Sequence, residues 1–250
     1  MIFGFGSVRG VIGLPEHVTA CLFDLDGVLT GTAALHRAAW KETFDPLLAK
    51  HGQEPFTEAD YNNHVDGRPR FDGVRAFLAS RGIELPEGPP DAPPSDDTIQ
   101  GVGNRKNERV QEIIAERGVN PYPGSVRYLE AARKAGLRIA VVTSSANGEA
   151  VIDAANLSKF VEARVDGVVI TERKLKGKPA PDSFIAGAEA LNTAPANAAV
   201  FEDALSGVQA GKAGHFGYVV GVDRVGQAEE LKAHGADVVV TDLAQLLEDE

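Results

Sequence analysis

Two aspartates, Asp24 and Asp26, directly follow the apolar run Ala20–Phe23. Side chains two residues apart on a strand point to the same side, so both carboxylates can enter one cavity, and Gly27 allows a sharp turn after them. A pair of this kind also occurs in a solvated acidic turn or a structural calcium loop. Because the pair ends a run that predicts a buried strand, we expect it to belong to a chemical site.

Further polar residues follow three later apolar runs, and parallel strands would bring such residues to one edge of a sheet. Thr143 and its neighbours offer hydroxyl and backbone donors that suit an anionic oxygen. Lys178 lies in a loop restricted by prolines and offers a fixed positive charge. The three groups are Thr143-Ser144-Ser145 after Ile139–Val142, Lys178 within 176–182 after Val168–Ile170, and Glu202-Asp203 after Ala199–Phe201.

Together these groups supply what phosphoryl transfer requires, namely a nucleophile, a hard cation, charge neutralisation and a proton donor. Asp24 and Asp203 can coordinate Mg²⁺ through hard oxygens, while Thr143 and Lys178 can stabilise the transferring group. Each group alone also has an ordinary explanation, such as a hydroxyl-rich turn, a surface lysine, or an N-cap at Asp203 for a helix that begins at Ala204. Their common position at strand ends favours a single site.

Short apolar runs without alternation predict strands that are buried on both faces. Helical patterns at 126–132 and 184–191 separate the later runs. Strands that alternate with helices predict an α/β fold with a doubly wound, Rossmann-like parallel sheet. The predicted strands are Ala20–Phe23, Ile139–Val142, Val168–Ile170, Ala199–Phe201, Tyr218–Val222 and Val238–Val240.

The interval 33–120 shows helical faces around 40–48 and 110–114 but no convincing buried strand. We therefore expect an α-helical cap domain over 33–120, inserted into the α/β domain. The α/β core domain would comprise residues 1–32 and 121–250.

The charge balance and the cysteine content exclude several classes of protein. Twenty-five basic and 36 acidic residues give a formal net charge of −11, which disfavours a nucleic-acid-binding surface. Cys21 is the single cysteine, so an intrachain disulfide and a zinc site of clustered thiolates are excluded, and we expect a reducing, cytoplasmic setting. No apolar stretch reaches the roughly 18–20 residues of a membrane helix. The stretch 1–18 lacks a signal-peptide pattern, so we expect a loosely ordered leader that packs on the domain.

The motifs resemble those of the haloacid dehalogenase superfamily of aspartate-nucleophile phosphotransferases, over most of the chain. Within it, the chain is similar to the β-phosphoglucomutase group. The superfamily motifs are matched by Asp24-Leu25-Asp26-Gly27-Val28, Thr143, Lys178 and Glu202-Asp203. Segments similar to those of the group are Thr32-Ala33-Ala34-Leu35-His36 with Trp40, Gly67-Arg68-Pro69-Arg70, Arg105-Lys106-Asn107, Tyr122-Pro123-Gly124, Ser145-Ala146-Asn147 and 178–184.

The resemblance implies roles for the core residues. Asp24 would attack phosphate to give an aspartyl-phosphate, and Asp26 would protonate the leaving sugar oxygen and deprotonate the incoming one. Thr143, Ser144 and Lys178 would bind the transferring phosphate. The implied metal is Mg²⁺, and its implied ligands are the Asp24 carboxylate, the Asp26 backbone carbonyl and Asp203, with Glu202 as a further ligand or an outer partner.

The resemblance also implies that the cap is a lid that excludes water. Arg70 would hold the non-reacting phosphate of a sugar bisphosphate with help from Ser145 and Asn147, because a guanidinium matches phosphate oxygens. His36 and Lys106 would couple cap closure to substrate contact and to the position of Asp26. The implied substrate-binding set is His36, Trp40, Gly67, Arg70, Lys106, Ser145 and Asn147.

Three departures from the pattern of the group concern the hinge, the distal phosphate and the size of the cap. Gly31 stands where an aspartate often precedes the cap, and Ala146 stands where some members have a lysine near the distal phosphate. The proline-rich stretch 86–97 enlarges the cap, and we expect it to be irregular and exposed.

The implied activity is magnesium-dependent interconversion of β-glucose 1-phosphate and glucose 6-phosphate through the bound bisphosphate. We expect a monomer that binds a small sugar phosphate and neither nucleic acid nor membrane. One alternative is a phosphatase of the same fold that transfers the phosphate of sugar phosphates or other small phosphomonoesters to water. The other is a non-catalytic phosphate-ligand-binding or partner-binding module. The product formed from β-glucose 1-phosphate distinguishes the three.

Overall fold

The computed structural model describes residues 12–247, so the first part of the expected leader, 1–11, lies outside the described residues. The rest of the leader packs on the domain, where Ile12 and Val18 are buried in the main hydrophobic cluster. The Tyr128 hydroxyl donates a hydrogen bond to the Ile12 carbonyl oxygen at 2.9 Å. This segment is therefore fixed to the core before the first strand begins.

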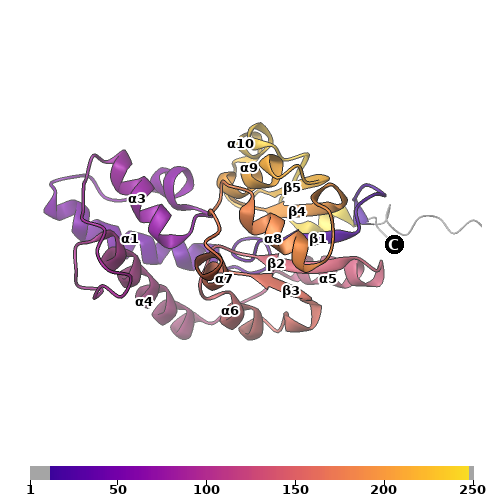
Figure 1. The fold of residues 1–250 in the computed structure, drawn as a ribbon, viewed down its shortest axis with the longest axis horizontal. Helices are drawn as coiled ribbons and strands as arrows, with labels where there is room; N and C mark the ends of the chain where they lie inside the picture. The colour runs from indigo at the N-terminus through magenta and orange to yellow at the C-terminus, as the bar shows by residue number, and fades with distance from the viewer. Residues whose placement is uncertain (1–11, 248–250) are drawn as a thin grey trace, which may run out of the picture.

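Six parallel strands form one sheet in the order β3-β2-β1-β4-β5-β6, shown on the right of Figure 1. The two central strands, β1 and β4, pair in register from Ala20 opposite Ala198 to Phe23 opposite Phe201. The chain proceeds outward from β1 in both directions, which is the predicted doubly wound arrangement. The strands are β1 (Ala20–Phe23), β2 (Arg138–Val142), β3 (Ala163–Val165), β4 (Ala198–Glu202), β5 (Tyr218–Val222) and β6 (Val238–Val240).

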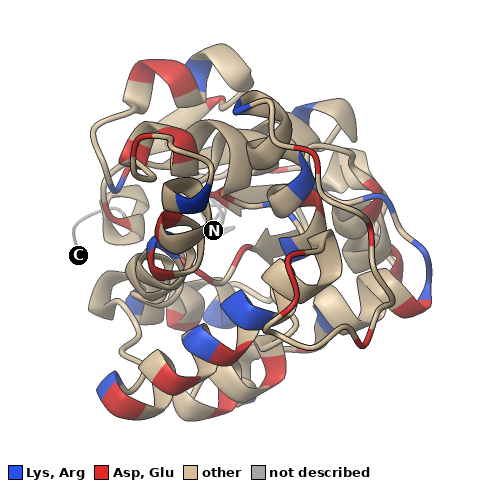
Figure 2. Cartoon of the chain, turned by 90° about the vertical axis from the view of Figure 1, so that its left-hand side faces the viewer, with Lys and Arg blue, Asp and Glu red and all other residues tan. Residues whose placement is uncertain are grey.

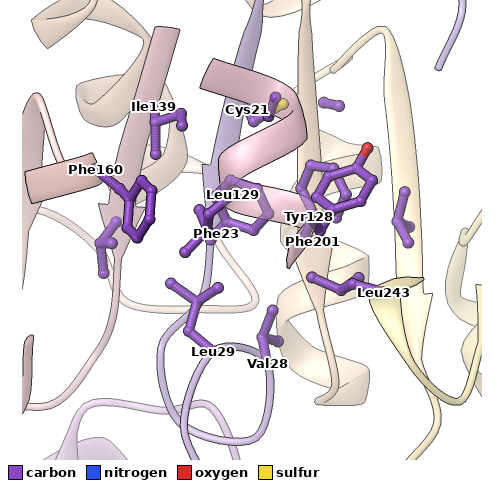
Figure 3. Packing of buried hydrophobic residues seen from close by; sticks show 14 of the residues in the cluster. Cys21, Phe23, Val28, Leu29, Tyr128, Leu129, Ile139, Phe160, Phe201 and Leu243 are labelled. Atoms are coloured by element: carbon purple, nitrogen blue, oxygen red, sulfur yellow. The ribbon is translucent and has the colours of Figure 1, made fainter. Parts of the chain in front are cut away.

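The central strand β1 is buried on both faces. Cys21 and Phe23 enter one hydrophobic cluster, while Ala20 and Leu22 enter another on the opposite face. In the first cluster, drawn in Figure 3, the Phe23 and Phe201 rings stack with their centroids 4.3 Å apart. Because both faces meet apolar side chains, the strand needs no polar alternation.

Helices cover both faces of the sheet. α5 and α6 contribute Leu129 and Ile152 to the first cluster, while α8 and α9 contribute Phe184 and Ala210 to the second. The helical patterns predicted before β2 and before β4 are confirmed by α5 and α8. The core helices are α5 (Pro123–Lys134), α6 (Gly148–Ala154), α7 (Gly167–Glu172), α8 (Asp182–Ala190), α9 (Leu205–Ala213) and α10 (Ala228–His234).

The predicted strand Val168–Ile170 is wrong, because these residues lie in α7. The Asp166 side chain accepts hydrogen bonds from the Val168 and Val169 backbone N–H groups at 3.0 and 3.1 Å, which caps a helix at this position. The strand lies just before it, in β3, an edge strand where Arg164 is only partly buried. A short, half-polar edge strand gives little hydrophobic signal, whereas the apolar first turn of a short helix imitates one.

The chain between β1 and α5 folds as a helical unit, on the left of Figure 1. It has its own hydrophobic cluster, in which the Trp40 and Phe44 rings stack with centroids 5.0 Å apart and Phe77 packs beside them. The helical faces predicted around 40–48 and 110–114 are confirmed. The elements are α1 (Ala33–Lys50), α2 (Glu58–Asp60), the π-helical turn η2 (Tyr61–Val65), α3 (Arg70–Ser80) and α4 (Ile99–Arg117).

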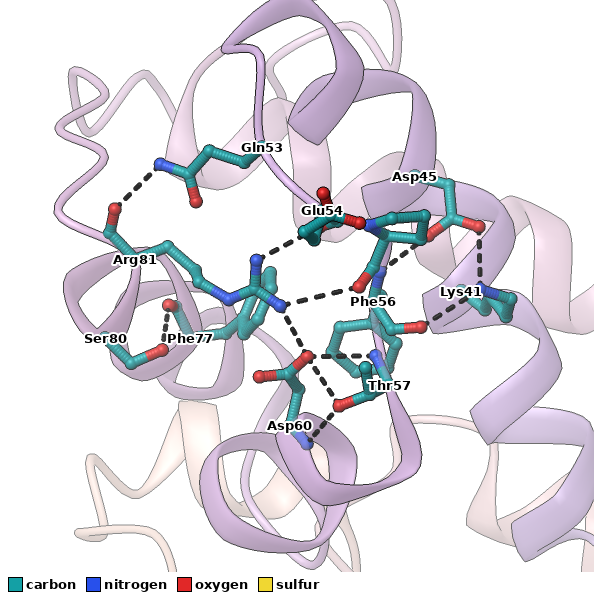
Figure 4. A network of polar contacts seen from close by, with 11 residues as sticks. Lys41, Asp45, Gln53, Glu54, Phe56, Thr57, Asp60, Phe77, Ser80 and Arg81 are labelled. Carbon is teal, nitrogen blue, oxygen red and sulfur yellow. Dashed lines mark hydrogen bonds and ion pairs between the residues drawn. The ribbon is translucent and has the colours of Figure 1, made fainter.

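A polar network fixes the end of α3 to the connection between α1 and α2, as Figure 4 shows. Arg81 donates hydrogen bonds to the Glu54 carbonyl oxygen at 3.1 Å and to Asp60 Oδ2 at 2.6 Å. Asp60 also accepts hydrogen bonds from the Thr57 backbone N–H and hydroxyl, at 2.9 and 2.8 Å. The helical unit therefore has internal polar links as well as its apolar cluster.

The stretch 86–97 is irregular, as predicted, and joins α3 to α4. It is not uniformly exposed, because Ala92 is buried and Glu87 accepts hydrogen bonds from Arg75 and Gln100. This stretch, called the proline-rich connection below, is thus mostly exposed, as predicted, but is attached to its neighbours at these points.

Two antiparallel segments join the helical unit to the sheet. Thr30 pairs with Pro121 in an isolated bridge. On either side of it, the Gly31 N–H donates to the Asn120 carbonyl oxygen at 3.0 Å, and the Tyr122 N–H donates to the Leu29 carbonyl oxygen at 2.9 Å. The chain therefore leaves and re-enters the sheet at one place, beside the acidic pair that follows β1.

Acidic and basic residues are interspersed along the ribbon at the end of the molecule that Figure 2 presents, without a continuous basic stripe. This agrees with the excess of acidic residues in the sequence. Among residues 12–247, no helix is both long and apolar enough to cross a membrane.

Candidate active site

Lys178 bridges two carboxylates at the carboxyl ends of the central strands. Its side chain is fully buried, and Nζ donates to Asp24 Oδ1 at 2.7 Å and to Glu202 Oε1 at 2.6 Å. Nζ also lies 3.3 Å from the Val142 carbonyl oxygen and 4.7 Å from the centre of the Phe184 ring. Burial disfavours the charged amine, but the two carboxylates outweigh burial and raise the pKa of Lys178. The lysine is therefore a fixed cation.

Asp24, Glu202 and Asp203 form a buried acidic cluster with ligand oxygens within 4.8 Å of one another. Burial and the neighbouring carboxylates raise the pKa of Asp24 and of Asp203 well above the usual value. Both Glu202 oxygens are engaged, one with Lys178 and the other with the Ala204 backbone N–H at 3.0 Å. A hard divalent cation fits this set, because oxygen ligands and uncompensated negative charge are what it requires.

Gly27 lets the loop after β1 approach Asp203. Its φ is +89°, and a Cβ at this position would lie 1.9 Å from Asp203 Oδ2. Any other residue would displace that carboxylate. Asp203 itself caps no helix, because α9 begins at Leu205 and its N-cap position is Ala204. The ordinary explanation of Asp203 as an N-cap is therefore wrong.

Asp26 contacts residues from both the helical unit and the rest of the described chain, which contains the sheet and is called the sheet domain below. Thr143 Oγ1 donates to Asp26 Oδ2 at 3.3 Å, while Oδ1 accepts a short hydrogen bond from Thr32 and lies 3.2 Å from His36 Nε2. Burial acts to raise the pKa of Asp26, but His36, Thr32 and Lys106 outweigh it and hold the pKa below its usual range. Asp26 is therefore held as a carboxylate.

His36 and Lys106 form a buried pair from α1 and α4. Lys106 Nζ lies 2.7 Å from His36 Nδ1 and 4.9 Å from the centre of the Trp40 ring. Burial lowers the pKa of Lys106 to about 7, although Asp26 opposes the shift. The sequence-predicted residues His36, Trp40 and Lys106 are thus brought together beside Asp26.

Stability should depend on pH through Lys106. Between the lowered pKa of about 7 and the usual 10.5, the unfolded chain keeps a proton that the folded chain releases. The free energy of unfolding of the wild type should therefore rise with pH relative to Lys106→Met, by up to about 1.4 kcal/mol per pH unit. Urea unfolding across this window measures the difference. The exposed Lys134→Met is the matched control and should follow the wild type. Parallel profiles for wild type and Lys106→Met would contradict a lowered pKa.

The loop after β2 makes hydrogen bonds both within itself and with the helical unit. The Thr143 hydroxyl accepts a hydrogen bond from the Ser145 N–H at 3.1 Å, and the Ser144 hydroxyl donates to the Gly67 carbonyl oxygen at 2.7 Å. The Asn147 amide bonds to Asn107 at 3.1 Å and to Gln111 at 2.9 Å, both on α4. Ser144 and Asn147 thus join the sheet domain to the helical unit.

Gly67 lies where the loop before α3 touches the sheet domain. Its φ is +72°, and a Cβ there would lie 2.5 Å from Ser206 Oγ and 2.9 Å from Ala204 Cβ. Ser206 Oγ donates to the carbonyl oxygen of Asp66 at 2.8 Å. Glycine at this position permits a close contact between the two parts of the chain.

Many of these residues line one cavity between the helical unit and the sheet domain, whereas Lys178 and Glu202 are not among its lining residues. It contains about 840 Å³ of space, part of it open to solvent. The residues predicted from sequence that line it include Asp24, Asp26, Arg70, Thr143, Ser145 and Asp203.

Sequence reasoning missed several residues of this site, including Thr32, Asn104, Asp66 and Arg68. Thr32 bonds to Asp26, and Asn104 accepts a hydrogen bond from Arg70 at 3.2 Å. Asp66 and Arg68 line the cavity, and burial and the nearby charge of Glu202 raise the pKa of Asp66 to about 7. Arg68 belongs to the matched segment Gly67-Arg68-Pro69-Arg70 and Asp66 directly precedes it, so that segment offered a signal for both.

The sheet is parallel and Rossmann-like, a helical unit follows its first strand, and a lysine–carboxylate site lies at the strand ends. These features define an α/β protein whose site is suited to phosphate chemistry. The profile of the family described as haloacid dehalogenase-like hydrolase matches residues 18–215. The chain belongs to this family.

Two curated relatives and one solved structure show how far the similarity extends. The beta-phosphoglucomutase of Mycobacterium tuberculosis is 55% identical over 247 residues, which span 95% of this chain and 94% of the relative. The beta-phosphoglucomutase of Bacillus subtilis is 31% identical over 91% of both chains. A crystal structure of CbbY from Rhodobacter sphaeroides in complex with phosphate has a TM-score of 0.69 and 26% identity, and covers 92% of this chain and 96% of that one.

Proposed function

We propose that the protein is a magnesium-dependent phosphomutase that converts β-glucose 1-phosphate to glucose 6-phosphate through the bound 1,6-bisphosphate. The observation that carries this proposal is 55% identity to a beta-phosphoglucomutase over 95% of the chain. The buried arrangement of Asp24, Lys178 and Asp203 supports the chemistry.

In the proposed reaction Asp24 is the nucleophile. Its carboxylate oxygen forms a bond to phosphorus while the bond from phosphorus to the sugar oxygen breaks, which gives an aspartyl-phosphate. Lys178, 2.7 Å from Asp24 Oδ1, is placed to neutralise charge on the transferring phosphate, and Thr143 and Ser144 line the cavity beside it.

Asp26 acts as general base and then as general acid. Held as a carboxylate by His36 and Thr32, it accepts the proton of the sugar hydroxyl that attacks the aspartyl-phosphate. It returns that proton to the leaving sugar oxygen when Asp24 attacks the other phosphate of the bisphosphate. The proton is therefore conserved over the cycle, and the ionised state of Asp26 is the correct starting state.

Mg²⁺ would be held by Asp24 and Asp203, with the Asp26 backbone carbonyl as a further ligand. Glu202 is better placed as an outer partner, because Lys178 and the Ala204 N–H engage its two oxygens. When bound, the metal neutralises the repulsion between the carboxylates and the phosphate.

We propose that residues 33–120 are a cap domain on a core formed by residues 1–32 and 121–250. The contacts of Ser144 with Gly67 and of Ser206 with Asp66 hold the cap loop against the core. A closed cap would exclude the water that otherwise hydrolyses the aspartyl-phosphate.

The cap also supplies the proposed substrate contacts. Arg70, partly buried and lining the cavity, would bind the non-reacting phosphate with help from Ser145. His36, Lys106 and Trp40 would contact the sugar and keep Asp26 in place. Gly67 and Asn147 would contribute by closing the cap, since both join it to the core.

We further propose that the protein works in the cytoplasm as a monomer. The single cysteine, Cys21, is buried in β1, and burial raises the pKa of its thiol, so it is an inert packing residue suited to a reducing compartment.

The product assay tests this function. Purified protein with β-glucose 1-phosphate, Mg²⁺ and a catalytic amount of glucose 1,6-bisphosphate should form glucose 6-phosphate, and removal of metal with EDTA should stop it. Free phosphate as the sole product would contradict the mutase and establish a phosphatase instead. Magnesium-dependent binding without turnover on a broad panel of phosphomonoesters would establish a binding module.

A further inference from the structure

The proline-rich connection, 86–97, contacts α4 at a residue next to the cavity. The backbone carbonyl oxygens of Pro90 and Ala92 accept hydrogen bonds from the side-chain nitrogen of Asn104, at 3.2 and 3.0 Å. Ala92 is 1% exposed. Both amide protons of Asn104 are therefore directed to the connection.

The opposite end of the same amide faces Arg70. Asn104 Oδ1 accepts a hydrogen bond from Arg70 Nη2 at 3.2 Å. A flipped amide would lose both bonds to the connection and would point its NH₂ group at a guanidinium, which has only donors. The connection therefore determines that Asn104 presents oxygen to Arg70.

A second contact keeps the connection in place. Arg105 donates to the Pro94 carbonyl oxygen at 2.6 Å and to the Asp96 carbonyl oxygen at 3.2 Å. At the end of the connection, the Thr98 hydroxyl caps α4 by accepting from the Gly101 N–H at 2.9 Å. The carbonyl groups that bind Asn104 are thus followed directly by a stretch, Pro94 to Thr98, that is hydrogen-bonded to α4.

Arg70 has few other constraints. Among the described residues, Asn104 provides the only hydrogen bond to its side chain, and its buried Nε has no partner. The guanidinium lies 4.7 Å from the centre of the Phe71 ring. The neutral Oδ1 of Asn104 fixes the guanidinium without neutralising its positive charge. Most of the five donors of the guanidinium therefore stay available to an anion.

We propose that Asn104 is a positioning residue for Arg70, and that the proline-rich connection orients it. The connection and Asn104 hold the guanidinium ready for the distal phosphate of the substrate. This inference rests on the proposed role of Arg70 in binding that phosphate. The proposal assigns a function to the proline-rich connection, the enlarged part of the cap: it acts on the site through the side-chain amide of Asn104.

A double-mutant cycle tests the proposal, with kcat and KM for β-glucose 1-phosphate as the measurements. Asn104→Ala should raise KM roughly tenfold with a smaller effect on kcat, as expected for loss of a hydrogen bond to a charged group. Arg70→Ala should lower kcat/KM by on the order of 10²-fold. In the Arg70→Ala background, Asn104→Ala should change kcat/KM by less than about twofold, because the residue it positions is gone.

Gln100→Ala is the matched control. Gln100 also joins α4 to the connection, by donating to Glu87 Oε1 at 2.9 Å, but among the described residues no hydrogen bond joins it to Arg70. Its effect on KM should be small. An Asn104→Ala effect equally large with and without Arg70 would overturn the proposal and leave Asn104 with a general structural role. Unchanged kinetics in Asn104→Ala would also overturn the proposal. Unaffected kinetics in Arg70→Ala would overturn both this proposal and the role of Arg70, whereas the identity of the product tests the mutase reaction separately.

Asn104→Asp is a second test variant, for use if Asn104→Ala folds poorly. Asn104→Asp keeps an oxygen for Arg70 but loses the protons that bind the connection, and its charge competes with phosphate for the guanidinium. The KM of Asn104→Asp for β-glucose 1-phosphate should rise when Arg70 is present and should not rise further in the Arg70→Ala background. Wild-type kinetics for Asn104→Asp would overturn the proposal, because neither the bonds to the connection nor the neutrality of the amide would then matter.

Discussion

Asp24→Asn is expected to abolish turnover, with a loss of on the order of 10⁴–10⁶-fold in kcat, because an amide cannot form the aspartyl-phosphate. The same change should stabilise the metal-free protein at pH 7. Burial and nearby carboxylates raise the pKa of Asp24 well above its usual value, so the folded protein resists the charge that the unfolded chain accepts freely. Asparagine imitates the neutral form and removes that cost, while Lys178 keeps Glu202 as its charged partner.

The sign of the pH effect follows from the raised pKa. The wild type loses stability as pH rises above the usual value of 3.8, whereas Asp24→Asn lacks this loss, so its advantage should grow with pH from about 4 upward. Rate assays and urea unfolding in EDTA measure the two effects. Asp72→Asn, which removes an exposed carboxylate paired with Arg75, is the control and should change neither. Residual turnover within about tenfold of wild type would contradict a nucleophilic Asp24.

The core of the site could be predicted from sequence because its chemistry fixes residue types at strand ends. Asp24, Thr143, Lys178 and Asp203 each follow a short apolar run, and the parallel sheet brings those ends together. The apolar run and the strand coincide for Asp24, and the strand contains the run for Thr143 and Asp203. Lys178 was also placed correctly, although the preceding run, Val168–Ile170, is a helix, because the lysine depends on its own loop rather than on that strand.

The parts that escaped prediction are those whose partners are backbone atoms or half-exposed side chains. Asn104 binds two carbonyl groups, and carbonyl groups occur at every residue, so nothing in the sequence distinguishes Pro90 and Ala92. The edge strand around Arg164 has too little apolar character to be recognised. Prolines in the connection predicted correctly that it is irregular, but not that it packs back on α4.

Lys178→Met should have the largest effect on stability. Methionine is similar in length and leaves Asp24 and Glu202 facing each other without the cation that lies 2.7 and 2.6 Å from their oxygens. Removal of one partner from a buried ion pair costs about 3–5 kcal/mol. The free energy of unfolding in EDTA should fall by this amount, and kcat/KM should fall by roughly 10²–10³-fold, because the transferring phosphate also loses its fixed charge.

The response of stability to added Mg²⁺ distinguishes an electrostatic cause of this instability from poor packing. Without Lys178, the cluster of Asp24, Glu202 and Asp203 carries one more unit of uncompensated negative charge, so a divalent cation should bind it more favourably than in the wild type. Added Mg²⁺ should therefore raise the free energy of unfolding more in Lys178→Met than in the wild type. The surface variant Lys41→Met, which breaks a half-exposed pair with Asp45, should lose less than about 1 kcal/mol and show no extra response to Mg²⁺. An equal magnesium response in Lys178→Met and wild type would show that Lys178 does not balance the charge of these three carboxylates.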